Sequence, residues 1–173
     1  PITLTAQSYG NFPYEEKFLG ATQPIDVTKP ESPLASVPNK ATFTEKGLQL
    51  TPNEQSSFGG IFINNRSFTS KNGITIEFEY MIYGGTGGDG ISMFLFDQST
   101  ANPTIGAVGA GIGYAYNRAY LGNQFNNLRM PGLSGAYMGV AFDTFGNFKA
   151  MRYQGESRVN GIAYSMPVAN SFN

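Results

Sequence analysis

The residues from 73 to 85, GITIEFEYMIYGG, constrain the fold most, because apolar and polar side chains alternate along them from Ile74 to Tyr80. A β-strand points successive side chains to opposite faces, so a period of two indicates a strand with one face inward and one in water. The inward face would carry Ile74, Ile76, Phe78, Tyr80 and Ile82, and the outward face Thr75, Glu77 and Glu79. This segment therefore favours a β-rich fold.

Four further runs have the composition of short strands and turns. They are FTEKGLQLTP (43–52), SFGGIFINN (57–65), GISMFLF (90–96) and AYMGVAFDTFGNFKA (136–150). The run at 90–96 is apolar on both faces, which is typical of a central strand covered on both sides or lining a concave surface. Because no amphipathic helix is evident and 22 glycines and 10 prolines supply frequent turns, we predict an all-β sandwich of antiparallel sheets.

The length of 173 residues suits one domain with one core. Residues 1–40 carry six of the ten prolines, so we expect an irregular opening segment with one edge strand near 14–19, followed by the sandwich over 41–173. The chain begins at Pro1 and ends in SMPVANSFN without a closing strand. We therefore expect a processed or excised piece of a longer chain, whose remaining strands follow Asn173.

Composition excludes several classes of function. The chain has no cysteine and no histidine, which removes thiolate and imidazole metal sites, disulfides, and Ser-His or Cys-His catalysis. The net charge is −1 and the 11 lysines and arginines are scattered, so nucleic acid is not an expected partner. No apolar run approaches the roughly 20 residues of a membrane helix, and no signal peptide is present at the start. Any bound metal would have to prefer oxygen ligands.

The glycine-rich stretch GTGGDG at 85–90 satisfies the pattern GxGxxG. A dinucleotide site needs this loop to open a helix, but the strand-like ISMFLF follows it. The simpler interpretation is a hairpin turn in which glycine supplies positive φ. That interpretation does not explain Asp89, the one charged residue of the loop.

Glu77 and Glu79 share one strand face, as the two carboxylates of a glycoside hydrolase would. Alternating glutamates are also ordinary on the water-facing side of a strand, and Met81 does not continue the acidic row. Ser134 in GLSGA lacks the nucleophile-elbow pattern, and the chain offers no histidine as its base. We therefore expect no enzymatic activity.

The stretch FDTFGNF at 142–148 can be interpreted in two ways. A tight turn from Asp143 to Asn147 supplies carboxylate, amide and carbonyl oxygens, the ligands that calcium prefers. Aspartate, asparagine and glycine are equally common in turns that bind nothing. The residues alone leave both alternatives open.

Three motifs in order, GGDGISMFLFD (87–97), GAGIGYA (109–115) and GVAFDTFGNF (139–148), resemble the L-type lectins, a family of concanavalin A-like sandwiches. The resemblance runs from about residue 42 to residue 148. In manner it is closest to lectin-like modules of large bacterial surface proteins, some of which occur in secreted adhesins of gliding bacteria. It implies a jelly-roll sandwich with a shallow, calcium-dependent carbohydrate site.

The resemblance also implies roles for individual residues. Asp89 would accept hydrogen bonds from sugar hydroxyls, and Asp143 would bind calcium. Phe145 would give its carbonyl to calcium and its ring to the sugar, and Asn147 would bind both. A glycine loop whose backbone N–H completes the sugar contacts fits 109–113, with Gly111 as its candidate, while AYLG at 119–122 is a second alternative.

The chain departs from the family pattern in its metal ligands. Ala141 stands where a glutamate is expected and no downstream histidine exists, so the resemblance implies no transition metal. The second calcium aspartate has no counterpart in FKAMRYQGES, where Glu156 is the nearest carboxylate and Lys149 or Arg152 would supply charge instead. Calcium bound through Asp143, Phe145 and Asn147 is the expected cofactor.

We therefore expect a non-enzymatic, calcium-assisted carbohydrate-binding module of a secreted or cell-surface adhesin, with a glycan or polysaccharide as its partner. The alternative is a sandwich of a surface or gliding-motility protein that binds other surface or secretion proteins and no sugar. A glycoside hydrolase built on Glu77 and Glu79 is the third hypothesis.

Overall fold

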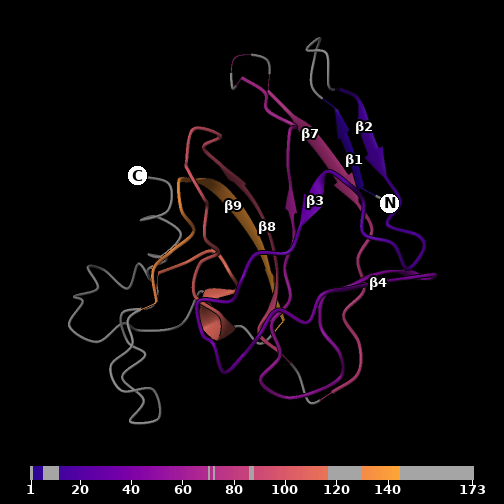
Figure 1. Cartoon of the computed structure of the whole chain (residues 1–173), viewed down its shortest axis with the longest axis vertical. Coiled ribbons are helices and arrows are strands. Elements are labelled where there is room, and N and C mark those ends of the chain that lie inside the picture. The colour runs from indigo at the N-terminus through magenta and orange to yellow at the C-terminus, as the bar shows by residue number, and fades with distance from the viewer. Residues whose placement is uncertain are drawn as a thin grey trace. The chain divides into compact units, whose positions relative to one another are not determined.

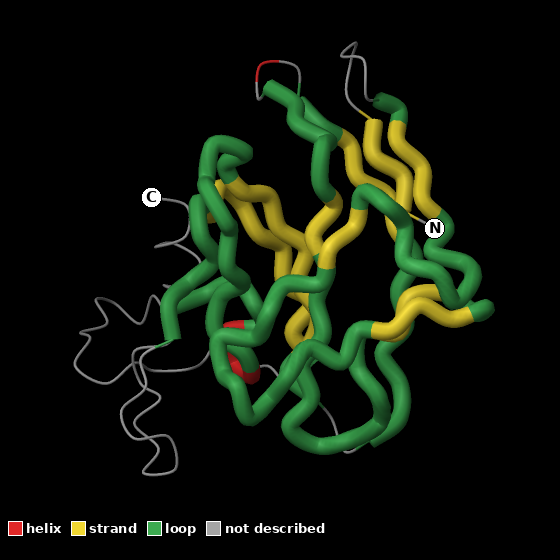
Figure 2. The backbone as a smooth tube through the Cα atoms, viewed as in Figure 1, coloured by secondary structure: helices red, strands yellow, loops and turns green. Residues whose placement is uncertain are grey.

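The computed structural model describes residues 2–5, 12–69, 71, 73–85, 88–116 and 130–144. Within them the chain is almost entirely strand and loop, which confirms the expected all-β character (Figures 1 and 2). The strands are β1 (Ile2–Thr5), β2 (Tyr14–Glu16), β3 (Val27–Thr28), β4 (Thr42–Thr44), β5 (Gly47–Gln49), β6 (Phe62–Ile63), β7 (Thr75–Phe78), β8 (Gly90–Phe96) and β9 (Ala136–Asp143). The described residues also include the short 3-10 turn η2 (Gly109–Gly111).

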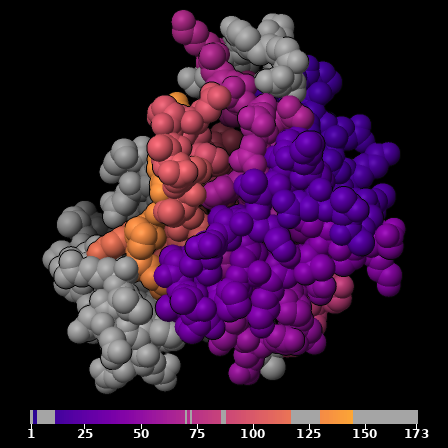
Figure 3. All heavy atoms as spheres, viewed as in Figure 1, coloured from indigo at the N-terminus to yellow at the C-terminus, as the bar shows by residue number. Residues whose placement is uncertain are grey.

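The chain forms two compact units. Unit 1 comprises Pro1–Pro30 and Asn39–Tyr83, and unit 2 comprises Glu31–Pro38 and Gly84–Asn173. Strands from before residue 40 pair with strands after it, since β1 pairs with β7 and β3 pairs with β6. The N-terminal residues, drawn in indigo and purple, make up most of the face of unit 1 that is visible in Figure 3.

The largest sheet of unit 1 has the antiparallel order β2-β1-β7. The edge strand β2 lies inside the range 14–19 where the sequence analysis expects one. The alternation along β7 is as predicted, because Ile76 and Phe78 are half-buried while Thr75 and Glu77 are exposed. The strand ends earlier than predicted, since its pairing with β1 stops at the Ile2–Phe78 pair.

Two smaller antiparallel pairs complete unit 1, β3 with β6 and β4 with β5. The β4–β5 hairpin turns at Glu45 and Lys46, and Gly47 has a φ of +128°. Phe18, Val27 and Phe43 form the buried core cluster, with partly buried aliphatic side chains packed around it. At roughly 2 kcal/mol for each large apolar side chain removed from water, this cluster is a main source of stability for the unit.

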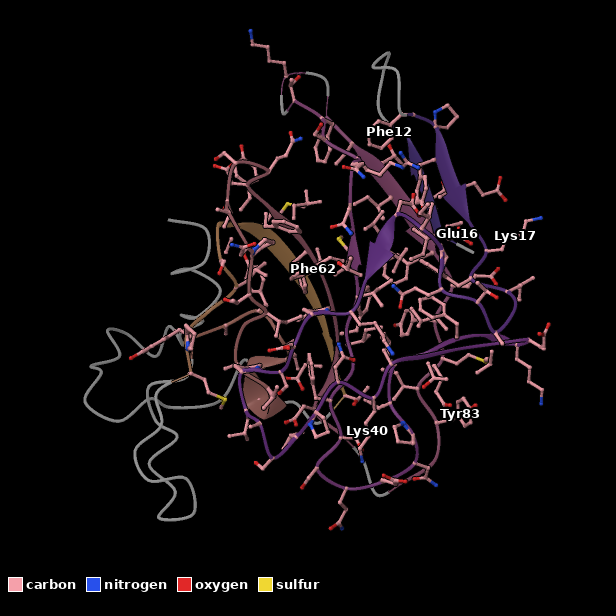
Figure 4. The ribbon with its side chains drawn as sticks, in the orientation of Figure 1. Phe12, Glu16, Lys17, Lys40, Phe62 and Tyr83 are labelled. Atoms are coloured by element: carbon pink, nitrogen blue, oxygen red, sulfur yellow. The ribbon has the colours of Figure 1, made fainter. Side chains whose placement is uncertain are left out.

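A partly buried polar cluster also stabilises unit 1. The Arg66 guanidinium lies 2.7 Å from the Asp26 carboxylate and stacks 4.4 Å from the centre of the Tyr14 ring. Burial, followed by the nearby charge of Asp26, raises the pKa of Tyr14 well above its ordinary value of about 10. The Tyr14 hydroxyl is buried, and this burial beside the Asp26 carboxylate keeps it protonated. Phe62 of β6, which lies in the interior of this unit, is labelled in Figure 4.

Unit 2 is built on the antiparallel pair of β8 and β9, which runs from the Gly90–Asp143 pair to the Phe96–Ala136 pair. A register shift between Leu95 and Phe96 interrupts the ladder near its end. The segment from 105 to 115 is a loop that contains η2, and most of its residues are buried. No helix among the described residues has the length and apolarity that crossing a membrane requires.

Candidate functional site

Asp89 and Asp143 meet at one end of the β8–β9 ladder. Asp89 immediately precedes β8, and Asp143 is the last residue of β9. The first residue of β8, Gly90, pairs directly with Asp143. The antiparallel register therefore brings two carboxylate-bearing residues that are 54 positions apart in sequence to neighbouring positions.

Gly90 allows this approach because no other residue fits at its position. A Cβ there would overlap the carbonyl oxygen of Phe142 and lie 2.9 Å from the Cα of Asp143. The φ of Gly90 is +137°, a backbone conformation that side chains rarely permit. The close approach of β8 to β9 next to Asp89 therefore requires glycine at position 90.

The glycine loop at 105–115 packs on one face of the β8–β9 pair. Directly paired residues of an antiparallel ladder point to the same face, so Asp143 shares its face with Ser92 and Phe94. The Ser92 hydroxyl donates a 2.6 Å hydrogen bond to the carbonyl of Ile112, and the Phe94 ring stacks on Tyr114 with 6.1 Å between centroids. The Asp143 side chain thus points to the face on which the glycine loop lies.

Gly109 is a glycine of this loop that lies beside Asp89. A Cβ on Gly109 would lie 3.7 Å from the Asp89 carboxylate oxygen Oδ2. Gly109 is exposed and has a φ of +65°, whereas Gly111 is buried, and a Cβ on it would lie 2.8 Å from that of Ala107. Within the predicted range 109–113, the backbone beside the Asp89 carboxylate is that of Gly109.

Thr144 connects the residues that follow β9 to those that precede β8. Its hydroxyl donates a 3.1 Å hydrogen bond to the carbonyl of Gly88. Sequence reasoning did not single out Gly88, Gly90 or Thr144. The sequence feature that points to Gly88 and Gly90 is their position on each side of Asp89, since glycine next to a functional residue often marks close backbone approach.

Several predicted site residues lie outside the described residues. These are Phe145, Asn147, the second glycine stretch at 119–122, and the charged residues Lys149, Arg152 and Glu156. Of the predicted calcium ligands, the structure describes only Asp143. Among the described residues, no group of three or more acidic side chains lies close enough to hold a metal ion.

The remaining sequence patterns have simpler structural outcomes. GTGGDG leads into β8 rather than a helix, so it lacks the helix N-terminus that receives a dinucleotide phosphate. Nor does it close a hairpin, because β8 pairs with β9 and β7 with β1. Glu77 is exposed on β7 opposite Thr3, and Glu79 is exposed after the strand has ended.

Comparison with known proteins gives no significant match to a family model, to a curated protein sequence or to a solved structure.

Proposed function

We propose that this chain is a calcium-assisted carbohydrate-binding module with a concanavalin A-like jelly-roll sandwich, which binds a glycan and catalyses no reaction. The observation that carries the proposal is the convergence of the three lectin-like motifs. Asp89 of the first lies 3.7 Å from the Cβ position of Gly109 in the second, and the residue after it pairs with Asp143 of the third. Motifs 20 to 50 residues apart in sequence therefore meet at one end of β8–β9.

The chemistry of this convergence suits a sugar. A carboxylate accepts hydrogen bonds from two neighbouring hydroxyls, and an exposed glycine backbone lets a ring approach without a side chain in the way. Gly88, Asp89, Gly109 and Thr144 are all at least partly exposed, as a shallow site requires. An affinity in the micromolar to millimolar range is expected for so small a set of contacts.

Calcium is part of the proposal. Asp143 would hold the ion together with the carbonyl of Phe145 and the side chain of Asn147, since calcium prefers such oxygen ligands. Asp143 points to the glycine-loop face and is half-buried. The ion would fix these turns before the sugar arrives and so lower the ordering cost of binding. A secreted or cell-surface location belongs to the same proposal.

Glycan-array binding with and without EDTA tests this function. We expect wild type to bind a subset of glycans with calcium and to lose them with EDTA. Asp89→Asn should weaken binding about tenfold, because one hydrogen bond to a charged group contributes about 1.5–3 kcal/mol. Asp97→Asn is the matched control, since Asp97 follows the opposite end of β8. Wild type that binds no glycan with calcium, or an Asp97 variant as weak as the Asp89 variant, would contradict the proposal.

One observation favours a second function, a protein-interaction module that binds no sugar. Four consecutive large apolar residues after β7 are exposed: Tyr80 by 45%, Met81 by 83%, Ile82 by 45% and Tyr83 by 81%. Tyr83 is labelled in Figure 4. Exposed apolar patches often mark protein contacts. Under this function, Asp89→Ala and Asn147→Ala would leave partner binding unchanged, and Tyr83→Ser would weaken it.

A further inference from the structure

The sequence around Asp89 is rich in glycine. Five of its seven residues from 84 to 90 are glycine, which loses more conformational freedom on folding than any other residue. An acceptor for sugar hydroxyls must nevertheless hold one position, because each freely rotating contact lowers the affinity. Contacts from outside the loop therefore have to fix Asp89.

Two successive residues of the neighbouring strand supply such contacts. Gly90, on one side of Asp89, is paired with Asp143 in the ladder. Gly88, on the other side, accepts the 3.1 Å hydrogen bond from the Thr144 hydroxyl. The ladder ends at Asp143, so the Thr144 side chain extends the connection by one residue beyond the last paired strand position.

We infer that Thr144 is a positioning residue of the proposed carbohydrate site, whose hydroxyl fixes the Asp89 loop against β9 so that Asp89 is ready to accept hydrogen bonds from sugar hydroxyls. The inference rests on the proposed function for its ligand. It does not rest on it for the geometry, since the hydrogen bond to Gly88 fixes the loop whatever binds there.

The exposure of the hydrogen bond between Thr144 and Gly88 determines how much its loss should change the affinity for the glycan. Thr144 and Gly88 are both exposed, so water competes for the hydroxyl and the carbonyl. A net contribution at the lower end for one hydrogen bond corresponds to a change of roughly twofold to fivefold in affinity. The calcium Kd should change less than the glycan Kd, because the Thr144 hydroxyl bonds to the residue before Asp89, whereas the proposed calcium ligands Asp143, Phe145 and Asn147 belong to the end of β9 and the residues after it.

The experiment compares Thr144→Val, which keeps the shape and removes the donor, with Thr144→Ser, which keeps the donor. Thr42→Val is the matched control, because the exposed Thr42 hydroxyl also donates a 3.1 Å bond to a backbone carbonyl, that of Lys40 in unit 1. The glycan that wild type binds best on the array and calcium are each titrated by calorimetry. Amide hydrogen exchange is measured at Asp89 and Gly90.

We expect Thr144→Val to raise the glycan Kd roughly twofold to fivefold, to leave the calcium Kd within about twofold, and to speed exchange at Asp89 and Gly90. Thr144→Ser should restore all three values, and Thr42→Val should change none. The inference is overturned if Thr144→Val binds and exchanges like wild type, if the serine variant is as weak as the valine variant, or if Thr42→Val causes the same loss. If wild type binds no glycan at all, the proposed function fails, and the exchange rates of the two Thr144 variants still decide the role of its hydroxyl.

Discussion

Substitution of Gly90 by alanine should open the end of the β8–β9 ladder. The added methyl would overlap the carbonyl oxygen of Phe142 and lie 2.9 Å from the Cα of Asp143, well inside the usual carbon–carbon contact of about 3.5–4.0 Å. Both neighbours are backbone atoms, so no side-chain rotation relieves the contact. The φ of +137° adds strain, because an alanine rarely occupies that conformation.

Two responses are open to the chain, and their costs decide between them. Holding the present backbone costs about 1–3 kcal/mol for the strained φ and about 1–3 kcal/mol for the overpacked contact. Releasing the Gly90–Asp143 pair gives up the last rung of the ladder, about 1 kcal/mol of hydrogen bonding. Release is the cheaper response, so we expect a stability loss of about 1–2 kcal/mol in unit 2 and separation of Asp89 from Asp143.

Amide exchange is the suitable assay, because the chain has two compact units and exchange at single amides reports on each unit separately. In the Gly90→Ala variant the amides of residues 90 and 143 should exchange faster, while the exchange rates of the amides in β4 and β5 should stay the same. Glycan and calcium titrations should both weaken, because the ladder end carries Asp89 and Asp143.

Two glycines provide matched controls for this prediction. Gly88 has no atom within 4 Å of a Cβ position and no positive φ, so Gly88→Ala should be nearly neutral. Gly47 has a similar φ of +128° in unit 1, also with nothing within 4 Å, so Gly47→Ala isolates the strain of about 1 kcal/mol. The reasoning is refuted if Gly90→Ala leaves exchange at the ladder end unchanged, or if it costs no more than Gly88→Ala.

Three further predictions concern other parts of the chain. Gly109→Ala should weaken glycan binding several-fold, because a methyl would stand beside the Asp89 carboxylate in a left-handed conformation that costs about 1 kcal/mol; calorimetry showing unchanged affinity would contradict this. Arg66→Gln should destabilise unit 1 by about 1–3 kcal/mol in exchange or denaturation experiments, because its ion pair with Asp26 is partly buried. Lys40→Gln, which breaks a more exposed ion pair, should cost less than about 1 kcal/mol. Equal losses of stability in the two variants would contradict this prediction. As the pH rises, Tyr14 keeps its proton in the folded state after the unfolded chain has lost it, so the stability that it contributes is complete below about pH 10 and falls at higher pH. Tyr14→Phe should therefore make the free energy of unfolding depend less on pH in this alkaline range, as measured by denaturation at several pH values. An unchanged dependence would count against the buried cluster.

The elements that sequence predicts well are those with a local signal. Part of the alternation predicted at 74–82, the strand-like run at 43–52 and the apolar runs of β8 and β9 all appear as strands. Each of these signals depends on side chains within a few residues of one another, so a local pattern suffices to find them, a period of two for β7 and a continuous apolar run for β8. Their bounds depend on the pairing partner, which is why β7 stops at Phe78.

The elements that sequence predicts poorly depend on distant partners. Residues 2–5 alternate apolar and polar side chains over only four positions, too short a run to stand out from the proline-rich opening segment, yet they form the central strand of the β2-β1-β7 sheet by pairing with residues 75–78. Backbone hydrogen bonds hold that strand in place, and any sequence of suitable shape can make them. The site divides in the same way, since residue type identifies Asp89 and Asp143 as candidates but only the register makes them neighbours.

The glycines of unit 2 explain why the composition is easily misinterpreted. A glycine-rich sequence indicates turns, yet three of these glycines are places where other atoms come close. A Cβ on Gly90 would meet the backbone of β9, one on Gly139 would lie 2.9 Å from the Tyr114 ring, and one on Gly106 would lie 2.6 Å from the Tyr114 carbonyl. Because these contacts join β8, β9 and the glycine loop, they hold together the three segments that carry the proposed site. The glycine content of the motifs is thus a packing requirement of unit 2 itself, and it would persist in a relative of the same fold that had lost sugar binding. A test of function must therefore rest on substitutions of Asp89, Asp143 and Asn147 rather than on substitutions of the glycines.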